Sequence, residues 1–475
     1  MLYINGEWVT TEEQLDVINP STGEVIDSVS KSSKSEAADA VKAAKENMKD
    51  WSKKTAKDRY GYLKRAAEIL RSRTDKIAEV ITNEMGKPLK ESKGEISLAT
   101  DYLDWYAEEG RRIYGETIPA SAGNKRLTVK SQPVGVVGAI TPWNFPIAMI
   151  TRKIAPALAA GCTVVLKPAS ATPSTAVEVF KAFHEAGIPK GVVNLLHGSA
   201  REITQVLMDS SDVRKITFTG STEVGKQLMK QSADTMKKIS MELGGHAPFI
   251  VFEDADLEQA TDGAISSKFR NAGQTCVCAN RIYVHESIAE EFSALLAKKI
   301  KSLRIGDGNE DQVEIGPLID SEAVEKAFEH VEDAKNKGAG IAAGGNKLTS
   351  GKFKNGFFFE PTLLTNATEE MKISHEETFG PVAPVFSFKT EEEAIEKANN
   401  SPYGLASYMY TKDGSRMVRV SEALEYGIVG VNDPLPTVAQ APFGGVKESG
   451  LGREGGHHGI KDFLEEKFIS VQIED

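Results

Sequence analysis

Apolar residues recur at intervals of three and four through the first quarter of the chain, a spacing typical of helices with one buried face. The spacing predicts a helix over residues 36–49, a longer helix over 56–84 and a third from about Leu98 to Arg112. The apolar positions on one side of the longest helix are Leu63, Ala66, Ala67, Leu70, Ile77 and Val80. We interpret these faces as core packing surfaces.

From residue 134 onward, short runs rich in β-branched residues alternate with helical segments. The runs lie at 134–140, 163–166, 192–196 and 216–218, and the helical segments at roughly 150–160, 173–186 and 200–209. Strands that alternate with helices predict a parallel sheet covered on both faces. Ligands of such sheets bind beyond the carboxyl ends of the strands, so the site is expected at that edge.

A second α/β unit is predicted from Ala247–Phe252 onward. Its other segments are helices near 256–272 and 286–303, runs between 357 and 432, and glycine-rich surface loops at 306–316 and 338–351. The predicted fold class is therefore α/β, with two doubly wound parallel-sheet domains. The length of 475 residues agrees with this division, because it exceeds what one hydrophobic core supports.

Composition narrows the class of protein. The formal net charge of -11 argues against a nucleic-acid partner, because phosphate binding requires a basic face. No run of about eighteen apolar residues occurs, and Met1–Glu7 lacks the pattern of a signal peptide, so we expect no membrane contact and a cytoplasmic location. Three cysteines fit a reducing compartment better than a disulfide framework.

Two segments carry the candidate chemistry. Cys276 ends a segment with two amide side chains and a glycine, and Glu242 precedes the double glycine Gly244–Gly245. A thiol and a carboxylate on separate loops suggest a nucleophile and a base that serve one covalent intermediate. We expect Cys276 to lie in a polar, partly exposed setting that lowers its pKa, whereas Cys162, inside an apolar run, fits a small buried hydrophobe.

These two segments resemble the two signature motifs of the aldehyde dehydrogenase superfamily, and the similarity runs from about Ile18 to the last twenty residues. Within the family, residues 140–146, 266–270 and 425–430 are most similar to succinate-semialdehyde dehydrogenases. The resemblance implies that Cys276 attacks the aldehyde and that Glu242 activates the water that hydrolyses the thioester. It assigns the oxyanion to Asn144 and the backbone N–H of Cys276.

The resemblance also divides the chain. It implies a dinucleotide-binding domain from residues 1–114 and 134–243, and a catalytic domain from 244–447. Residues 115–133 and 448–475 would then form a small β-flap for oligomerisation. Residues 467–473 alternate like an edge strand, which invites pairing, so we expect a homo-oligomer, a dimer or a dimer of dimers.

The cofactor site is expected at three strand-end turns. The turn Phe218–Gly225 follows a strand and opens a helix, where Gly220 would let the backbone come close to a pyrophosphate and the free N–H groups at the helix start favour an anion. Its spacing differs from G-x-G-x-x-G, so the turn alone favours an ordinary strand–helix connection. By resemblance, the cofactor-binding residues are Trp143, Asn144, Lys167, Ser170, Gly220, Ser221, Gly225, Leu243, Glu377 and Phe379.

Position 170 discriminates between the two nicotinamide cofactors. By resemblance Lys167 bonds the adenosine ribose, and it also belongs to the implied catalytic set with Cys276, Glu242 and Asn144. A glutamate at position 170 would accept both ribose hydroxyls and repel a 2′-phosphate, whereas Ser170 tolerates that phosphate. We therefore expect NADP⁺ to be accepted and preferred, with NAD⁺ as the alternative.

Arginines point to the substrate class. Arg152 and Arg270 match positions that bind the succinate-semialdehyde carboxylate in the enzymes the chain resembles, and arginine supplies a bidentate fork for such a group. The loop 432–442 departs from this pattern. In some family members this loop carries a serine that also contacts the carboxylate, and the matching position here is Val438, beside Thr437. The departure leaves glutarate semialdehyde and other ω-carboxy or amino aldehydes open.

Other interpretations of the cysteines remain. Cys278 lies two residues from Cys276 without a histidine cluster, so no metal site is expected. It is either an inert neighbour or the partner in a reversible Cys276–Cys278 disulfide, which would require backbone rearrangement. A cysteine hydrolase or acyltransferase without cofactor would have no use for Lys167 and Glu377, and a non-catalytic protein of the same fold would not need the four proposed catalytic residues.

Overall fold

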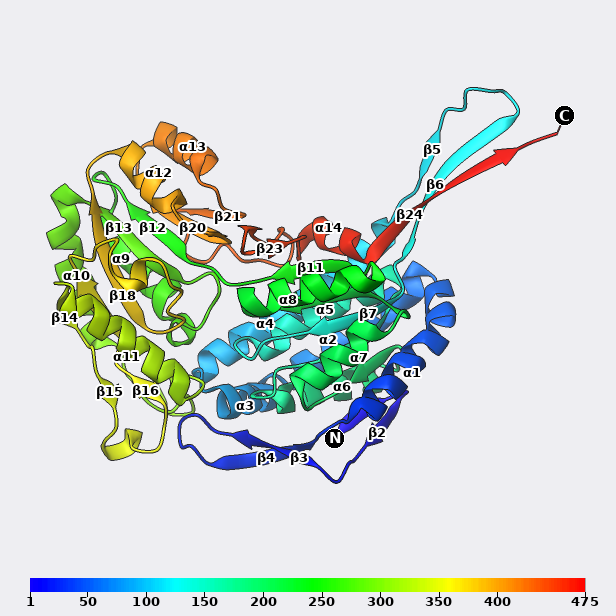
Figure 1. The fold of residues 1–475 in the computed structure, drawn as a ribbon, viewed down its shortest axis with the longest axis horizontal. Helices are drawn as coiled ribbons and strands as arrows, with labels where there is room; N and C mark the ends of the chain where they lie inside the picture. Colours follow the sequence, from blue (N-terminus) through cyan, green and yellow to red (C-terminus); the bar gives the residue numbers. More distant parts are fainter. Residues whose placement is uncertain (475) are drawn as a thin grey trace.

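The computed structural model describes residues 1–474, and two α/β domains and a projecting three-stranded sheet make up most of it (Figure 1). The first domain is built on an eight-stranded sheet whose strand order is β2-β1-β9-β8-β7-β10-β11-β23. Its strands are β1 (Leu2–Ile4), β2 (Glu7–Val9), β7 (Val136–Ile140), β8 (Thr163–Lys167), β9 (Val193–Leu195), β10 (Val213–Thr219), β11 (Lys238–Glu242) and β23 (Gly450–Leu451). The five strands from β9 to β11 are parallel, and β1 and β23 join them antiparallel.

Helices cover both faces of this sheet because successive strand residues point to opposite sides. Val164 and Leu166 pack into one core cluster, whereas Val165 packs into the other. The helices of the first domain are α1 (Lys34–Lys53), α2 (Ala56–Ser72), α3 (Thr74–Met85), α4 (Leu89–Glu109), α5 (Pro146–Ala160), α6 (Pro173–Glu185), α7 (Ala200–Asp209) and α8 (Thr222–Ser232). The prediction of a doubly wound parallel sheet is thus confirmed for this domain.

Three details differ from the sequence prediction. The single helix expected over 56–84 is two helices, which break at Arg73, where φ is -113° and ψ is 16°. Helix α4 begins at Leu89, directly after Pro88, and not near Leu98. Strand β11 was not predicted, and Glu242 is its last residue, so this carboxylate lies at a strand end and not in a loop.

The second domain repeats the architecture with a seven-stranded sheet, β14-β17-β18-β13-β12-β20-β21, in which only the β14–β17 pair is antiparallel. The strands are β12 (Ala247–Val251), β13 (Ala279–His285), β14 (Gly340–Ala343), β17 (Thr362–Thr365), β18 (Val382–Phe388), β20 (Ala406–Tyr410) and β21 (Ile428–Val431). The helices are α9 (Leu257–Phe269), α10 (Ala289–Ser302), α11 (Ser321–Asn336), α12 (Glu391–Asn399) and α13 (Gly414–Ala423).

The glycine-rich segment 338–351 is not only a surface loop, as was expected. It contains the edge strand β14 and the first strand of the hairpin β15 (Lys347–Leu348) and β16 (Phe358–Phe359). Segment 306–316 also differs, because Gly308 and Gly316 are buried against the backbone of Gly86 and Lys87 in the first domain. Glycine is needed there because a side chain would meet that backbone.

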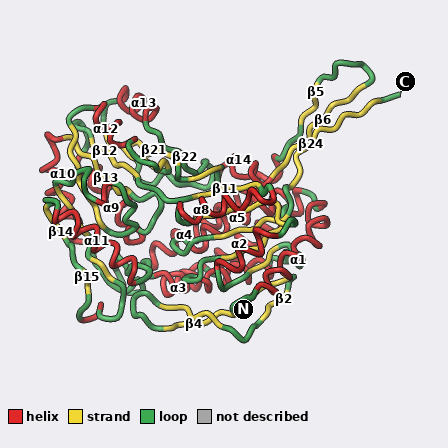
Figure 2. Tube along the Cα trace, in the orientation of Figure 1, coloured by secondary structure: helices red, strands yellow, loops and turns green. Residues whose placement is uncertain are grey.

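The projecting sheet contains β5 (Glu116–Ile118), β6 (Lys125–Pro133) and β24 (Leu464–Gln472) in the order β24-β6-β5. It extends away from both domains, and the C-terminal end of the chain lies near its tip (Figure 2). Of the expected segment 448–475, residues 450–463 pack instead on the first domain. Strand β23 pairs with β11, and Ile460 and Phe463 are buried in the same core as α4 and α5.

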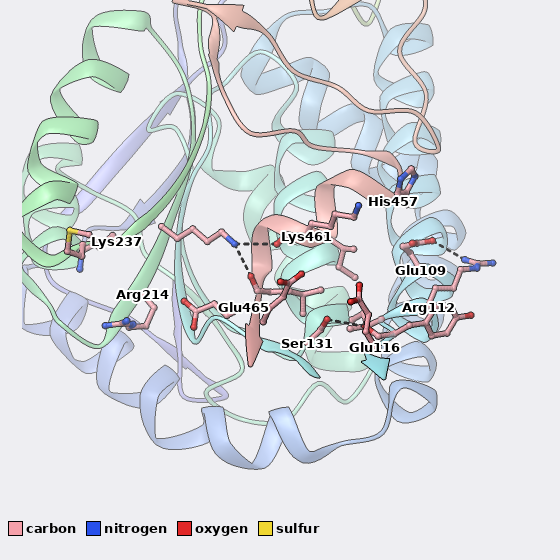
Figure 3. A pocket seen from close by; sticks show the side chains of 16 residues that line it. Glu109, Arg112, Glu116, Ser131, Arg214, Lys237, His457, Lys461 and Glu465 are labelled. Atoms are coloured by element: carbon pink, nitrogen blue, oxygen red, sulfur yellow. Dashed lines mark hydrogen bonds and ion pairs between the residues drawn. The ribbon is translucent and has the colours of Figure 1, made fainter. Parts of the chain in front are cut away.

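A cavity of about 910 Å³ opens at the base of the projecting sheet (Figure 3). Charged side chains of both signs line it, among them Glu109, Arg112, Arg214, Lys461 and Glu465. None of the predicted catalytic, cofactor-binding or substrate-binding residues lines this cavity. No helix of residues 1–474 is long and apolar enough to cross a membrane.

Candidate active site

Two cavities share the side chain of Cys276. The larger, of about 500 Å³, is lined by Pro142, Trp143, Asn144, Met149, Thr219, Gly220, Ser221, Leu243, Gly244, Cys276, Glu322, Lys326, Glu377 and Phe379. The smaller, of about 60 Å³, is lined by Leu98, Tyr102, Phe145, Ala148, Met149, Arg152, Arg270, Thr275, Cys276, Val277, Thr437 and Phe443. The thiol therefore lies where a compartment formed by both domains meets a narrow, side-chain-lined one.

The chain reaches Cys276 through a left-handed turn. After α9 ends at Phe269, the φ angles of Asn271, Ala272 and Gly273 are 53°, 53° and 78°. A side chain at Gly273 would collide with the carbonyl oxygen of Gly380, so only glycine fits. The next residue, Gln274, is tied by its side chain to Asn271 O (3.1 Å) and Ile319 N (2.9 Å).

The electrostatic setting of Cys276 differs from the expectation. The residue is partly exposed, but burial raises the pKa of its thiol to about 12, and the guanidinium of Arg152 only partly opposes this rise. Desolvation penalises the thiolate more than the nearby cations favour it. The thiol is therefore protonated at neutral pH, and a bound reactant or a base is needed to generate the nucleophile.

Glu242 is a buried carboxyl at the carboxyl end of β11. Its side chain is 2% exposed, and its Oε2 atom has no hydrogen-bond partner among residues 1–474. Burial, reinforced by the negative charge of Glu454, raises the pKa of Glu242 well above its usual range. A carboxyl with a raised pKa suits a general base that works near neutral pH.

Glu454 was missed by the sequence reasoning. It is buried and forms ion pairs with Arg152 Nε and Lys153 Nζ, each at 2.5 Å. Burial alone would raise the pKa of Glu454, but Lys153 and Arg152 together lower it. A lone carboxylate in a glycine-rich stretch 212 residues beyond Glu242 gives no sequence signal of this contact.

Asn144 lies two residues before α5 and bridges the two domains. Its Nδ2 donates to Gln274 O at 3.0 Å, and its Oδ1 has no partner among residues 1–474. An amide nitrogen carries two hydrogens, so one remains for an acceptor in the larger cavity. The predicted oxyanion donor thus lines the same cavity as Cys276.

Several predicted cofactor residues line the larger cavity: Trp143, Asn144, Gly220, Ser221, Leu243, Glu377 and Phe379. The Trp143 and Phe379 rings pack edge to face with centroids 5.6 Å apart. Glu377 accepts from Gly245 N at 3.1 Å, and burial raises the pKa of Glu377 to about 7. A Cβ atom on Gly244 would lie 3.0 Å from Glu377 Oε2, so this wall depends on the glycine.

Three predicted residues lie outside both cavities. Lys167 ends β8 and is 4% exposed, and burial lowers its pKa to about 8. Its Nζ is 3.4 Å from Ser170 Oγ, which in turn is 3.4 Å from Gly198 O. Gly225 packs on the side chain of Leu243, so it allows helix α8 to approach rather than facing the cavity. Ser221 both lines the cavity and caps α8 through Val224 N.

The smaller cavity has a wall formed by one face of α5. The wall contains Phe145, the N-cap of α5, and three residues of the helix, Ala148, Met149 and Arg152. These four positions follow one another at intervals of one, three or four residues, so they lie on one side of the helix. This spacing was the available signal for a substrate wall, and the sequence reasoning used only Arg152 of the four. Thr437 lines the cavity from the opposite loop, whereas Val438, the position aligned with the family's serine, does not.

The two predicted substrate arginines differ in their pairing. Arg152 is buried, ion-paired with Glu454 and stacked 4.1 Å from the centroid of Phe443. Arg270 forms no ion pair with any residue from 1 to 474 and lies over the Phe145 ring at 5.3 Å. Arg270 is therefore the arginine of this cavity without an ion-pair partner, although its charge also opposes the rise that burial causes in the pKa of the Glu91 carboxyl.

Cys278 is fully buried and lines neither cavity. Its thiol is 3.4 Å from Lys268 O, and burial raises its pKa while Lys268 opposes the rise. All three cysteines are free. The hypothesis of a Cys276–Cys278 disulfide would thus require Cys278 to leave its contact with Lys268.

Comparison with known proteins agrees with this geometry. The model of the "Aldehyde dehydrogenase family" matches residues 8–469. The chain is 52% identical to a glutarate-semialdehyde dehydrogenase of Pseudomonas putida, over 99% of this chain and 97% of that protein. It is 51% identical to the NADP⁺ succinate-semialdehyde dehydrogenase GabD of Escherichia coli, with the same coverage. A crystal structure of an E. coli NADP-dependent enzyme superposes with a TM-score of 0.97 at 50% identity, covering 100% of this chain and 98% of that one.

The thiol of Cys276 lines a cavity that both α/β domains form, and the fold and the comparisons together define an oxidoreductase. The chain belongs to the aldehyde dehydrogenase family. It is an NAD(P)-dependent aldehyde dehydrogenase, as the two signature segments predicted. The alternatives of a cofactor-free hydrolase and of a non-catalytic relative are thereby set aside.

Proposed function

We propose that the enzyme oxidises succinate semialdehyde to succinate and prefers NADP⁺. The observation that carries the substrate is Arg270, an unpaired guanidinium in the wall of the cavity that also contains Cys276. An aldehyde bound at the thiol would extend a distal carboxylate toward that charge. The relative named succinate-semialdehyde dehydrogenase, at 51% identity, supports the same choice.

Glutarate semialdehyde is the second candidate. A relative of that name is 52% identical over nearly the full length. Thr437 is a small side chain in the wall of this cavity. One methylene group more or less changes binding only modestly in such a pocket. The two acids differ only in chain length, and the same guanidinium serves both.

The residues of the larger cavity fit a nicotinamide dinucleotide. Glycines at 220 and 244 leave backbone accessible, and the start of α8 offers free N–H groups to a pyrophosphate. Trp143, Asn144, Leu243, Glu377 and Phe379 would hold the nicotinamide half, with Lys167 and Ser170 at the adenosine ribose. When bound, the nicotinamide supplies the acceptor for the hydride that leaves the aldehyde carbon.

Acylation begins when the thiol of Cys276 passes its proton to a water molecule in the cavity and its sulfur attacks the aldehyde carbon. A C–S bond forms while the carbonyl π electrons move to oxygen, where the free N–H of Asn144 stabilises the negative charge. The guanidinium groups of Arg152 and Arg270 favour the thiolate electrostatically. When the oxyanion reforms its carbonyl, hydrogen departs with the bonding electron pair and a thioester remains on Cys276.

Deacylation falls to Glu242. Its carboxylate takes a proton from water as the oxygen attacks the thioester carbon, the C–S bond breaks, and Cys276 is released with the free acid. Because the pKa of Glu242 is raised, the carboxylate is a stronger base than an exposed glutamate. This step sets the pH dependence of turnover.

The substrate proposal is tested with three aldehydes of similar reactivity. We expect kcat/KM for succinate semialdehyde to exceed that for butanal by at least about 100-fold, because a charge-assisted bidentate contact is lost with butanal. Glutarate semialdehyde should fall within about 10-fold of the better acid substrate. Equal values for succinate semialdehyde and butanal would refute a carboxylate site.

We also propose that the enzyme is a homo-oligomer, a dimer or a dimer of dimers. The support is the projecting sheet, whose strand β24 exposes Phe468 (59%), Val471 (49%) and Ile469 (38%). An exposed apolar edge strand of nine residues invites pairing with another chain. Light scattering should give a multiple of 51.5 kDa, and Phe468→Asp should lower the mass. A monomeric wild type would exclude this proposal.

A further inference from the structure

A buried ion pair lies behind the predicted oxyanion donor, and no step of the proposed mechanism uses it. Lys87 precedes α4, and Glu95 lies in the second turn of that helix. The Lys87 Nζ is 2.7 Å from Glu95 Oε2, and the two side chains are 0% and 1% exposed. Burying two charges costs desolvation free energy, so a pair of this kind is weak evidence for stability alone. The contacts that each side chain makes beyond its partner indicate what the pair does.

Lys87 also holds the main chain of Asn144. Its Nζ donates to the carbonyl oxygen of Asn144 at 2.7 Å and lies 3.9 Å from the centroid of the Phe145 ring. Asn271, in the left-handed turn before Cys276, donates from Nδ2 to the same oxygen at 3.1 Å. A carbonyl oxygen has two lone pairs, so these two donors satisfy it. The main chain at Asn144 is thus fixed both by the segment before α4 and by the turn that leads to the nucleophile.

Glu95 fixes the start of α5. Its Oε1 accepts from Ile147 N at 2.9 Å and from Ala148 N at 3.1 Å. The first N–H groups of a helix have no partner within it, and the N-cap residue Phe145 makes no side-chain hydrogen bond. The carboxylate therefore caps α5 from another helix, and its negative charge lies at the positive end of the helix dipole. Glu95 thereby sets where α5 begins relative to α4.

The same end of α4 holds the turn that leads to Cys276. Glu91, in the first turn of α4, accepts from Asn271 N at 2.8 Å. The main-chain N–H of Leu89 donates to Gly308 O at 3.0 Å, so the start of α4 is also tied to the second domain. One helix end therefore contacts both the segment of the oxyanion donor and the segment of the nucleophile.

This framework orients the side chain of Asn144. Its Nδ2 has one hydrogen on Gln274 O and one left for an acceptor in the larger cavity. An oxyanion donor is most effective when it is already in place, because no free energy is then spent on moving it during the reaction. Misplacement by about 1 Å can cost about 100-fold in rate. Lys87 and Glu95 line neither cavity, so they would act on the reaction through the main chain that carries Asn144.

We propose that Lys87 and Glu95 are positioning residues that hold Asn144 in place to receive the oxyanion. Lys87 fixes the carbonyl group of Asn144, and Glu95 fixes the helix start that follows and balances the buried ammonium charge. The inference rests on the proposed function, because it requires the role that the mechanism gives to Asn144. Loss of either side chain should slow the step in which the oxyanion forms.

Lys87→Met tests the inference, since it removes the ammonium donor and keeps an unbranched side chain. With enzyme in excess over succinate semialdehyde and with saturating NADP⁺, a single turnover gives the rate constant for formation of reduced cofactor. This rate constant belongs to each folded active site, so a partly unfolded preparation leaves it unchanged. We expect it to fall about 10- to 100-fold. Lys87→Met/Glu95→Gln leaves no unpaired buried charge, so it should be more stable than Lys87→Met and yet show a similar loss.

Glu84→Gln is the matched control. Glu84 is also a buried carboxyl that caps a helix from another helix, because it accepts from Ser174 N at 2.8 Å and from Thr175 N at 2.9 Å at the start of α6. No residue of α6 lines either active-site cavity. Its rate constant should stay within about twofold of the wild-type value even if its melting temperature falls. A loss equal to that in Lys87→Met would overturn the inference, because any lost helix cap would then slow the reaction.

Asn144→Ala completes a double-mutant cycle with Lys87→Met. Alone, it should lower the rate constant by about 10²- to 10³-fold, the usual effect of removing an oxyanion donor. If Lys87 acts through Asn144, the double variant should be slower than Asn144→Ala by no more than about twofold. A further loss as large as that of Lys87→Met in the wild type overturns the inference, and so does an unchanged rate constant in Lys87→Met. The proposed role of Asn144 fails separately, if Asn144→Ala alone keeps the wild-type rate constant.

Discussion

The cavity assigned to the cofactor and the cavity assigned to the aldehyde share Cys276 but differ in their construction. The first, of about 500 Å³, is lined by backbone at Gly220 and Gly244 and by side chains from contiguous motifs. The second, of about 60 Å³, is lined almost entirely by side chains from α4, α5, the Cys276 turn and the loop that contains Thr437. The wall of the first cavity includes two glycines, and the wall of the second includes none.

The difference separates what family members share from what distinguishes them. A wall of glycines and strand ends recognises the phosphate and ribose groups common to all dinucleotides. A wall of side chains can change its charge and shape one residue at a time, which alters the aldehyde without disturbing the cofactor. Relatives near 50% identity bear the names of different semialdehydes, consistent with this division.

The largest expected effect on activity is that of removing the sulfur of Cys276, the residue that lines both cavities. Cys276→Ala should lower aldehyde oxidation by roughly 10⁴-fold or more, because no covalent intermediate forms. The reduced cofactor is followed by its absorbance. Cys278→Ala, two residues away and outside both cavities, is the control and should retain activity. Substantial turnover by Cys276→Ala would remove the thiol from the mechanism.

Glu242→Gln should separate the two half-reactions. Steady-state turnover is expected to fall by about 10²- to 10⁴-fold, since the base for water is lost, while a burst of reduced cofactor of one equivalent per active site remains. In the wild type the rate should rise with pH as Glu242 loses its proton, at a pH above that of an exposed glutamate, because its pKa is raised. Stopped-flow absorbance measures the burst. Its absence would argue against a role confined to deacylation.

Ser170→Glu should change the cofactor side alone. A carboxylate at this position would repel the 2′-phosphate, so kcat/KM for NADP⁺ should fall about 100-fold while that for NAD⁺ is maintained or rises. Ser170→Ala removes the hydroxyl without adding charge and should have a much smaller effect. The ratio of the aldehyde kcat/KM values should be unchanged in both variants; a change would show that the two cavities are not independent.

Glu454→Gln should affect the smaller cavity through its supporting charges. The buried Arg152 and Lys153 would lose their partner, which is expected to lower the free energy of unfolding by about 3–5 kcal/mol. The pKa of Glu242 should also fall, because a neighbouring negative charge that raises it is gone. The pH–rate limb should therefore move to lower pH. Glu448→Gln, at an exposed ion pair, is the control, and an unmoved limb would contradict the coupling.

The same contrast explains how much could be predicted. The turn at 218–225 and the segments around Glu242 and Cys276 are contiguous, and each carries a backbone or chemical requirement that is visible in sequence. Tyr102 is indistinguishable from a helix core residue until α4 packs against α5, and Glu454 acquires its role only from tertiary contacts. The pKa of Cys276 was predicted in the wrong direction because desolvation depends on residues far away in the chain.

The prediction of the fold from the sequence had similar limits. Both sheets were predicted from the alternation of strands and helices, since that pattern is local and repeated. The break between α2 and α3 was not, because Arg73 and Thr74 carry no glycine or proline signal. Strand β11 was missed as a short run with polar residues, although it ends in Glu242.

The left-handed turn before Cys276 has a consequence for how the enzyme loses activity. Asn271 and Ala272 adopt a conformation that costs a non-glycine residue about 1–2 kcal/mol each, so the segment would relax if it were released. Its restraints come from both domains, through Asn144 on one side and Gly380 on the other. Slight separation of the two domains would free the nucleophile to drift while every helix and strand stayed intact. Catalytic competence is thus more fragile than the architecture that supports it.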